Sequence, residues 1–160
     1  RGDLTPGFLN SAAPALSYLQ DVASRGDQYR GFNLVLGDSQ GFYYLSNRQP
    51  GFIELTPGFY GLSNQQLNCD WPKVTRGREQ LKSIITTNSD LTASLFTLLS
   101  DRGDGTAFSN SFIESTTYGT CAKTVVLWRA DGSVEFEERC YVASGRPGSI
   151  RHYDFRTGES

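Results

Sequence analysis

The chain has 160 residues, which is enough for one domain with a hydrophobic core but short of two comfortable domains. Its 15 basic and 17 acidic side chains nearly cancel, which excludes a strongly basic surface, so we expect no nucleic-acid partner. No apolar run is long enough to span a bilayer and no signal-peptide pattern is present, so we expect a soluble protein with no transmembrane segment.

The sequence begins with Arg1 and contains no methionine, from which we expect a segment of a longer protein. Cys69, Cys121 and Cys140 match neither a disulfide framework nor a paired metal-binding pattern. We therefore predict a reducing, cytoplasmic location and no metal site. Cys121 stands at the start of an expected strand, where a cysteine is usually a small buried hydrophobic residue rather than a reactive thiol.

Hydrophobic spacing predicts an amphipathic helix within the first 25 residues. Asn10 or Ser11 is its candidate N-cap, and apolar residues then recur at helical spacing as far as Ala23. Short apolar and aromatic runs around a glycine-rich turn indicate strands after this helix. The expected strands are residues 32–36, 42–46 and 51–55.

The middle of the chain is predicted to be helical and its last third to return to strands. One helix begins near Trp71, and Asp90 is the candidate N-cap of the next. Strands at 124–128 and 134–138 flank a hairpin signal, and a closing strand follows around Tyr153. This order of strands, helices and strands predicts a single α+β domain over residues 1–160 rather than a βαβ repeat. The 8 tyrosines and 10 phenylalanines are interpreted as packing surface of sheets rather than as a cofactor cage.

The run from Gly58 to Asn64 is the candidate site loop, because neither a helix pattern nor a strand pattern explains it. Its glycines allow positive φ or a close approach of the backbone, and Asn64 offers two donors and one acceptor on a short stem. The alternative is a turn that leads out of a strand and caps the helix near Trp71. The residues alone leave both interpretations open.

Six blocks, in this order and with this approximate spacing, resemble successive blocks of one protein family. They are Arg1-Gly2-Asp3-Leu4, then Gly31-Phe32-Asn33-Leu34, Ser46-Asn47-Arg48, the run Gly58, Phe59, Tyr60, Gly61, Leu62, Ser63 and Asn64, then Trp71-Pro72-Lys73, and Tyr118-Gly119-Thr120 with Thr124. On these blocks the chain resembles the NRDE proteins, also called the Transport and Golgi organisation 2 family, over essentially its whole length.

The resemblance implies an αββα sandwich like that of the N-terminal-nucleophile hydrolases. It also implies that the domain is incomplete at its N-terminus, because the family's Met-Cys start, Asn-Arg-Asp-Glu signature and Gly-Gly-Thr-Trp-Leu-Gly block are absent. Relatives are associated with haem mobilisation, lipid or acyl-CoA metabolism and secretory-pathway organisation. A small apolar or amphipathic ligand is the function that this implies, with haem as a candidate cofactor, although His152 is the only histidine.

The alternative that the resemblance implies is a cysteine-nucleophile amidase or acyl-transfer hydrolase whose nucleophile lies upstream of this sequence. Asn64 would then be the oxyanion-hole amide, a donor that in a dry site is worth roughly 3 kcal/mol of barrier. Relatives usually read Tyr-Gly-Thr-Arg where this chain reads Tyr118-Gly119-Thr120-Cys121, which removes the cation such a site needs. His152, in the expected last strand, is interpreted as a sheet residue rather than a base.

Overall fold

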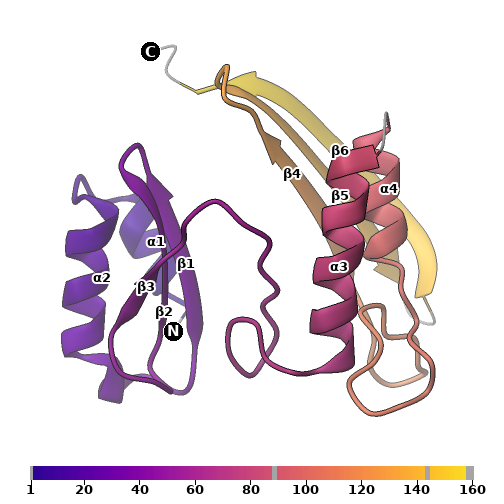
Figure 1. Ribbon diagram of the computed structural model, residues 1–160, viewed down its shortest axis with the longest axis horizontal. Coiled ribbons are helices and arrows are strands. Elements are labelled where there is room, and N and C mark those ends of the chain that lie inside the picture. The colour runs from indigo at the N-terminus through magenta and orange to yellow at the C-terminus, as the bar shows by residue number, and fades with distance from the viewer. Residues whose placement is uncertain (1, 88–89, 143–144, 158–160) are drawn as a thin grey trace. The chain divides into compact units, whose positions relative to one another are not determined.

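The computed structural model describes residues 2–87, 90–142 and 145–157, and the chain divides into two compact units, Arg1–Cys69 and Asp70–Ser160. Each unit combines helices with one three-stranded antiparallel sheet, which confirms the predicted α+β class (Figure 1). Arg1, the first residue of the first sequence block, lies outside the described residues. In the described ranges, none of the helices has both the length and the apolar character to cross a membrane.

The elements follow the predicted order. The first unit contains α1 (Leu4–Leu9), α2 (Ala15–Ser24), the 3-10 helix η1 (Gly26–Gln28), β1 (Asn33–Asp38), β2 (Gly41–Ser46) and β3 (Phe52–Glu54). The second contains α3 (Pro72–Thr87), α4 (Leu91–Leu98), β4 (Ala122–Trp128), β5 (Ser133–Val142) and β6 (Arg146–Arg156). The sheets have the strand orders β1-β2-β3 and β4-β5-β6, so each is a simple meander.

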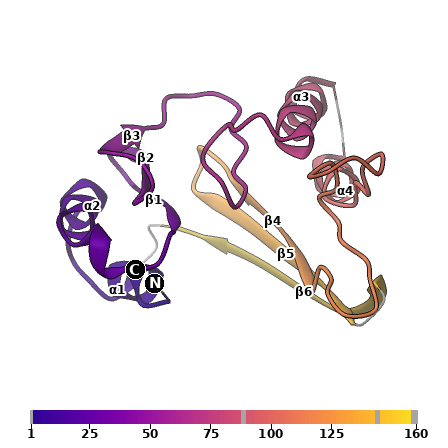
Figure 2. The ribbon, with the colours of Figure 1, turned by 90° about the horizontal axis from the view of Figure 1, so that it is seen from below.

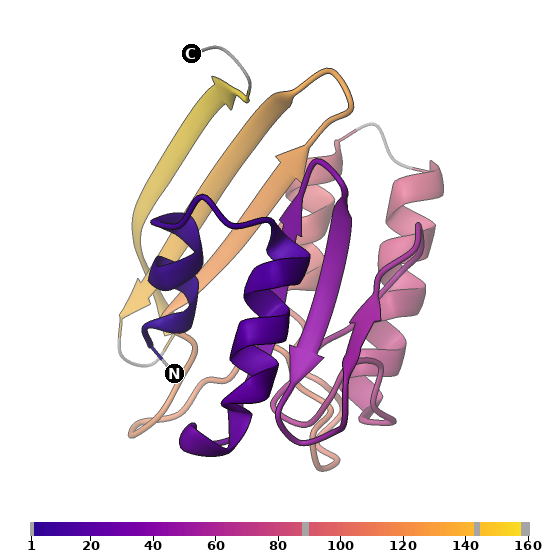
Figure 3. The same cartoon turned by 90° about the vertical axis from the view of Figure 1, so that its left-hand side faces the viewer.

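In the first unit, α1 and α2 lie on one face of the sheet (Figure 3). Alternation along the strands separates the residues that meet these helices from those that face away. One buried cluster joins the helices to the sheet and contains Leu4, Ala15, Leu19, Val22, Phe32, Leu34, Leu36, Tyr43 and Leu45. Val35, Phe42 and Ile53 lie on the opposite face and are 43%, 48% and 44% exposed. That face is therefore apolar but only partly covered.

The start of α2 differs from the prediction. The helix begins at Ala15 after Pro14, and Asn10 instead ends the short helix α1, where its Nδ2 donates to the carbonyl of Pro6 at 2.8 Å. The cap of α2 comes from the sheet, because the backbone N–H of Ala15 donates to Oδ2 of Asp38 at 2.8 Å. This hydrogen bond is the largest of the effects that lower the pKa of Asp38. A cap supplied from 23 residues away carries no local sequence signal.

In the second unit, α4 packs on one face of β4 and β5 (Figure 2). The guanidinium of Arg139 lies 3.7 Å from the ring centroid of buried Phe96, and Thr92 donates to Glu135 at 2.7 Å. The predicted cap is confirmed, since Oδ1 of Asp90 accepts a hydrogen bond from the backbone N–H of Ala93 at 3.0 Å.

The opposite face of the β4-β5-β6 sheet carries a patch of exposed apolar residues. Its residues stand in register across the three strands, with Val126 opposite Phe136 and Tyr153 on the next strands, and Trp128 in line with Phe155. Val126, Trp128, Tyr153 and Phe155 are between 52% and 57% exposed. The described residues of this unit thus form a helix layer and a sheet layer, with an apolar patch on the other sheet face left uncovered.

Candidate functional site

The loop from Gly58 to Asn64 follows β3 and is closed by Asn68. The side-chain Oδ1 of Asn68 accepts from the backbone N–H of Gly61 at 2.9 Å, and its own N–H donates to the carbonyl of Gly61 at 2.7 Å. Asn68 has φ of 56°, in the left-handed region where asparagine is tolerated. Leu62 and Leu67 form an isolated bridge inside the closed segment. The loop is therefore a defined structure held by its own backbone.

Asn33, from the second sequence block, fastens this loop to the sheet. Its Nδ2 donates to the carbonyls of Ser63 and Gln65, both at 3.2 Å, and its Oδ1 accepts from the hydroxyl of Tyr44 at 2.8 Å. The same hydroxyl accepts from the backbone N–H of Leu67 at 3.2 Å, and Tyr44 is fully buried. The amide of Asn33 is thus occupied in positioning the loop.

Asn47, which follows β2, holds the segment that leads into β1, as Asn33 holds the loop. Its Oδ1 accepts from the backbone N–H of Phe32 at 2.9 Å, while its Nδ2 donates to the carbonyls of Gly26 at 2.9 Å and Tyr29 at 3.1 Å. One side chain therefore joins η1, the approach to β1 and the end of β2.

Arg48 lies across the backbone of Gly31. A Cβ at Gly31 would stand 2.6 Å from Nε and 2.8 Å from Nη2 of the guanidinium, so this position of Arg48 requires glycine at 31. Its Nη1 donates to the carbonyl of Asn64 at 2.5 Å. Across the part of the chain that the structure describes, no carboxylate lies within ion-pair distance of Arg48.

These residues surround a polar groove of about 560 Å³. Its lining consists of Gly31, Phe32, Asn33, Arg48, Leu62, Ser63 and Asn64. All seven belong to the sequence blocks described above, and Arg48 is the one charged residue among them. The side-chain amide of Asn64 is exposed and has no hydrogen-bond partner within residues 2–87, 90–142 and 145–157. The structure therefore brings Asn64, the predicted site amide, beside a cation that sequence reasoning had not assigned to the site.

A second pocket of about 580 Å³ lies at the other end of the loop and has a mainly apolar lining. It is lined by Gln40, Gly41, Phe42, Glu54, Leu55, Thr56, Pro57, Gly58 and Tyr60. The hydroxyl of Tyr60 donates to the carbonyl of Thr56 at 2.8 Å, so two residues of the lining are joined to each other. The loop thus borders a polar groove at its end and an apolar pocket at its beginning.

The motif residues of the second unit have local structural contacts. Trp71 stacks on Phe108 with ring centroids 4.2 Å apart and an interplanar angle of 7°, and Nζ of Lys73 lies 5.3 Å from the centroid of the Trp71 ring. Pro72 is the first residue of α3, a position that suits proline because the missing N–H would have no helical partner. The Trp-Pro-Lys block therefore marks the start of the helix that was predicted to begin near Trp71.

The block of Tyr118, Gly119 and Thr120 closes a loop. The backbone N–H of Thr120 donates to the carbonyl of Ile113 at 2.9 Å, and its hydroxyl accepts from the N–H of Ile113 at 2.9 Å. A Cβ at Gly119 would stand 3.1 Å from the same carbonyl. Cys121, expected to be buried, is exposed, because β4 begins only at the next residue and Cys121 lies before the part of the strand that packs on α4.

His152 lies in β6, as predicted, and its side chain is exposed. Its Nε2 is 3.0 Å from Oδ2 of Asp154, and its Nδ1 is 3.4 Å from Oε2 of Glu137. These carboxylates, Asp154 first, raise the pKa of His152. The imidazole is thus held between two acidic residues of the sheet.

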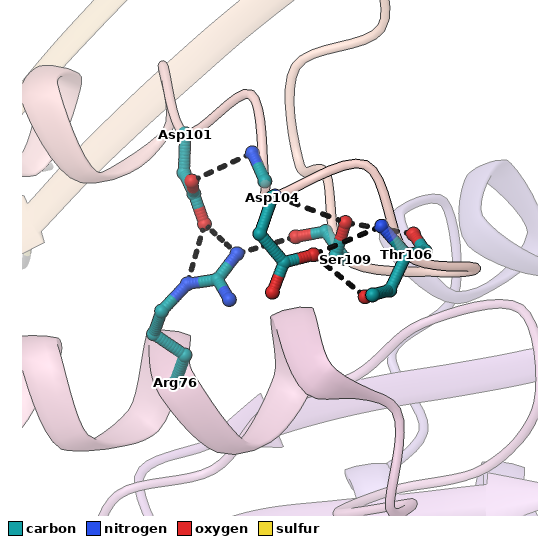
Figure 4. A network of polar contacts seen from close by, with 6 residues as sticks. Arg76, Asp101, Asp104, Thr106 and Ser109 are labelled. Carbon is teal, nitrogen blue, oxygen red and sulfur yellow. Dashed lines mark hydrogen bonds and ion pairs between the residues drawn. The ribbon is translucent and has the colours of Figure 1, made fainter.

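A polar network connects α3 to the loop after α4 (Figure 4). Nε and Nη2 of Arg76 donate to Oδ2 of Asp101 at 3.0 and 2.6 Å, and Nη2 also donates to the carbonyl of Ser109 at 2.5 Å. Asp104 accepts from the hydroxyl of Thr106 at 2.6 Å and from its N–H at 3.0 Å. The carboxylates of Asp101 and Asp104 are therefore occupied by hydrogen bonds within this unit. In the described ranges, no group of three or more His, Cys, Asp or Glu residues could hold a metal ion.

The hydroxyl of Thr106 is the largest of the effects that lower the pKa of Asp104, from 3.8 to about 2. Because the folded-state pKa is depressed, this carboxylate contributes stability above pH 3.8 that is lost as the pH falls towards 2. Thr106→Val is expected to move the pKa of Asp104 upwards and to narrow this pH window. A carboxyl-carbon NMR titration measures the change, and an unshifted Asp104 would contradict the assignment.

Comparison with known proteins places these blocks in one family. The model of the family Transport and Golgi organisation 2 matches residues 1–143. A human protein named "Transport and Golgi organization protein 2 homolog" is 31% identical over 188 aligned residues, covering 99% of this chain and 67% of the human protein. The mouse and bovine homologues are each 30% identical, over 87% and 90% of this chain and 61% and 63% of their own lengths. The chain thus spans about two thirds of the length of these relatives.

Proposed function

Since the chain belongs to the Transport and Golgi organisation 2 family, we propose that it binds a small amphipathic ligand at the loop from Gly58 to Asn64. The observation that supports this proposal is the convergence of three family blocks on one polar groove. Asn33 and Asn47 use their amides to hold the segments around the groove, whereas Asn64, whose amide is exposed, and Arg48 line it.

The amphipathic character follows from the two hollows that border the same loop. The groove at Asn64 is polar, and the pocket that includes Phe42, Leu55 and Tyr60 is mainly apolar. A ligand with a polar head and a hydrocarbon portion would use both, gaining about 0.8 kcal/mol for each methylene it buries. Small-ligand sites commonly combine apolar walls with a few placed polar groups.

Haem fits this site less well than a lipid or acyl chain. The lining of the polar groove contains no histidine, cysteine or tyrosine, which are side chains that commonly ligate haem iron. Tyr60 lines the apolar pocket, but its hydroxyl already donates to the carbonyl of Thr56. We therefore favour a ligand with an acyl chain over haem.

Titration calorimetry with dodecanol and hexanol tests the proposal. Dodecanol is expected to bind more tightly, because its longer chain buries more apolar surface. Leu55→Ser, which makes the apolar pocket polar, is expected to weaken dodecanol binding, whereas Leu9→Ser, at a leucine of the same unit that is 74% exposed, is expected to have no effect. Failure of both alcohols, and of dodecanoate and dodecyl phosphate, to bind would overturn the proposal.

A cysteine-nucleophile amidase or acyl transferase is the second candidate. It is favoured by the exposed amide of Asn64, which lies beside Arg48. Such a site needs an arginine, and this chain has Cys121 where relatives usually have one. In this candidate the amide would donate to the oxyanion of a tetrahedral intermediate. A cysteine-directed activity probe applied to the full-length protein tests it: labelling of a cysteine that is lost in Asn64→Ala supports catalysis, and no labelling opposes it.

We also propose that the α+β architecture is the αββα sandwich that the family resemblance implies. Each unit by itself supplies one helix layer and one sheet, and each sheet has an apolar face that its own helices leave uncovered. A sandwich stacks two such faces, with side chains from both filling the space between the sheets. Stacking would cover the side chains of Val126, Trp128, Tyr153 and Phe155, which are between 52% and 57% exposed.

Val126→Asp is expected to lower the free energy of unfolding by about 2 kcal/mol if this face is covered, because an unpaired charge would be buried. Val142→Asp is the matched control, since Val142 is similarly exposed, at 52% against 54%, but lies at the end of β5. Urea unfolding measures both variants. Equal, small effects would show that the face is open to water.

A cytoplasmic location completes the proposal. Cys69, Cys121 and Cys140 are all free thiols, and Cys121 is exposed. Exposed thiols are kept reduced in the cytosol, whereas secretory compartments oxidise them.

A further inference from the structure

We infer that the groove at Asn64 selects a ligand whose head is an oxyanion, a carboxylate or phosphate, bound by Arg48 and the amide of Asn64. This inference rests on the proposed function, because it specifies the head of the ligand proposed there. Its starting point is the charge of the groove: among the seven lining residues Arg48 carries a positive charge and none carries a negative one.

The guanidinium of Arg48 is fixed before a ligand arrives. The flat backbone of Gly31 supports Nε and Nη2, and the carbonyl of Asn64 holds Nη1. An exposed arginine normally loses side-chain entropy when it binds a ligand, but these two contacts already restrict Arg48. The cation is thus preorganised at the wall of the groove, where it remains exposed to solvent.

The partners of this arginine leave its charge uncompensated. The Asn64 carbonyl is neutral, and no described carboxylate comes within ion-pair distance. A guanidinium presents several N–H donors in a planar fork that matches the oxygens of a carboxylate or phosphate. The amide of Asn64 adds uncharged N–H donors on the same groove.

Three probes with the same twelve-carbon chain separate the head from the tail: dodecanoate, dodecyl phosphate and dodecanol. Titration calorimetry is expected to show both anions binding more tightly than the alcohol. Arg48→Gln is expected to weaken the two anions about tenfold to a hundredfold, the range for a hydrogen bond to a charged group, while leaving dodecanol within about twofold. The tighter of the two anions identifies the source of the head, a free acid or a phosphorylated compound.

Arg30→Gln is the matched control, because it removes the same charge at an exposed arginine directly before Gly31, and Arg30 does not line the groove. It is expected to leave all three affinities within about twofold at 0.15 M salt, where exposed charges are screened. Gly31→Ala is a second variant: the added Cβ displaces the guanidinium while Arg48 stays in the sequence. It is expected to weaken the anions and to spare dodecanol.

The outcomes separate the two proposals. If dodecanol binds as tightly as the anions, or Arg48→Gln behaves like Arg30→Gln, the oxyanion inference is overturned and amphipathic binding stands. If none of the three probes binds, the proposed function is overturned and this inference with it. Weaker anion binding in Arg48→Gln and Gly31→Ala, with unchanged dodecanol binding and unchanged circular dichroism, supports the inference.

Discussion

Asn47→Ala is expected to lower the free energy of unfolding of the first unit by about 3 kcal/mol. The substitution removes three hydrogen bonds, each worth about 1 kcal/mol, and leaves the backbone N–H of Phe32 without its acceptor. Phe32 is only 7% exposed, so water replaces that acceptor poorly. Chemical denaturation with urea, followed by circular dichroism, measures the loss.

Asn64→Ala is the matched control, since it makes the same chemical change at another asparagine of the motif. The Asn64 side chain is exposed and makes no hydrogen bond to the described parts of the chain, so the change in stability is expected to stay within about 0.5 kcal/mol. If both variants lose similar stability, Asn64 has a structural role and the groove loses its candidate amide. If neither does, the position of Asn47 in the structure is wrong.

The asparagines of the motif differ in whether their side-chain amides are occupied by hydrogen bonds, which the sequence does not indicate. The side-chain amides of Asn33, Asn47 and Asn68 all form hydrogen bonds with backbone groups. Asn64 instead accepts a hydrogen bond at its backbone carbonyl, and its side-chain amide is exposed. A sequence block records that an asparagine is present but not which of its atoms is occupied. The candidate role of Asn64 as a site amide therefore rests on the family resemblance. The structure shows in addition that Arg48 lies beside it.

The fold followed from the sequence where local patterns decide it. Alternation and helical spacing predicted the strands and the helices that start at Pro72 and Leu91, because burial on one face imposes those periods directly. The start of α2 was missed because its cap is Asp38, a residue of the sheet. α1 was missed because a proline and a glycine interrupt its six residues.

The candidate site was predictable only in part, for a related reason. Gly58 to Asn64 stood out because glycine and asparagine exclude regular structure, and the structure places Ser63 and Asn64 at the groove. Arg48 was recognised as part of a block, but its contact joins residues 16 positions apart. Neither spacing nor composition indicates that a guanidinium lies on Gly31, because this contact depends on how β1 and β2 pair.

Leu19→Ala is expected to have the largest effect on stability, about 3–4 kcal/mol. Leu19 is fully buried in the cluster that joins α2 to the first sheet, and truncating a buried leucine removes its transfer free energy and leaves a cavity. Leu9→Ala is the control, because Leu9 is 74% exposed and its loss is expected to cost less than about 0.5 kcal/mol.

The same pair of leucines also tests whether the groove depends on this core. β1 and β2 carry Asn33 and the approach to Arg48, and their inner residues Leu34 and Leu45 pack in the cluster with Leu19. Leu19→Ala is therefore expected to weaken dodecanoate binding near its lowered melting temperature but not at 10 °C, where the unit remains folded. Loss of binding at both temperatures would show that the cluster shapes the groove directly, and that the site is less rigid than its hydrogen bonds indicate.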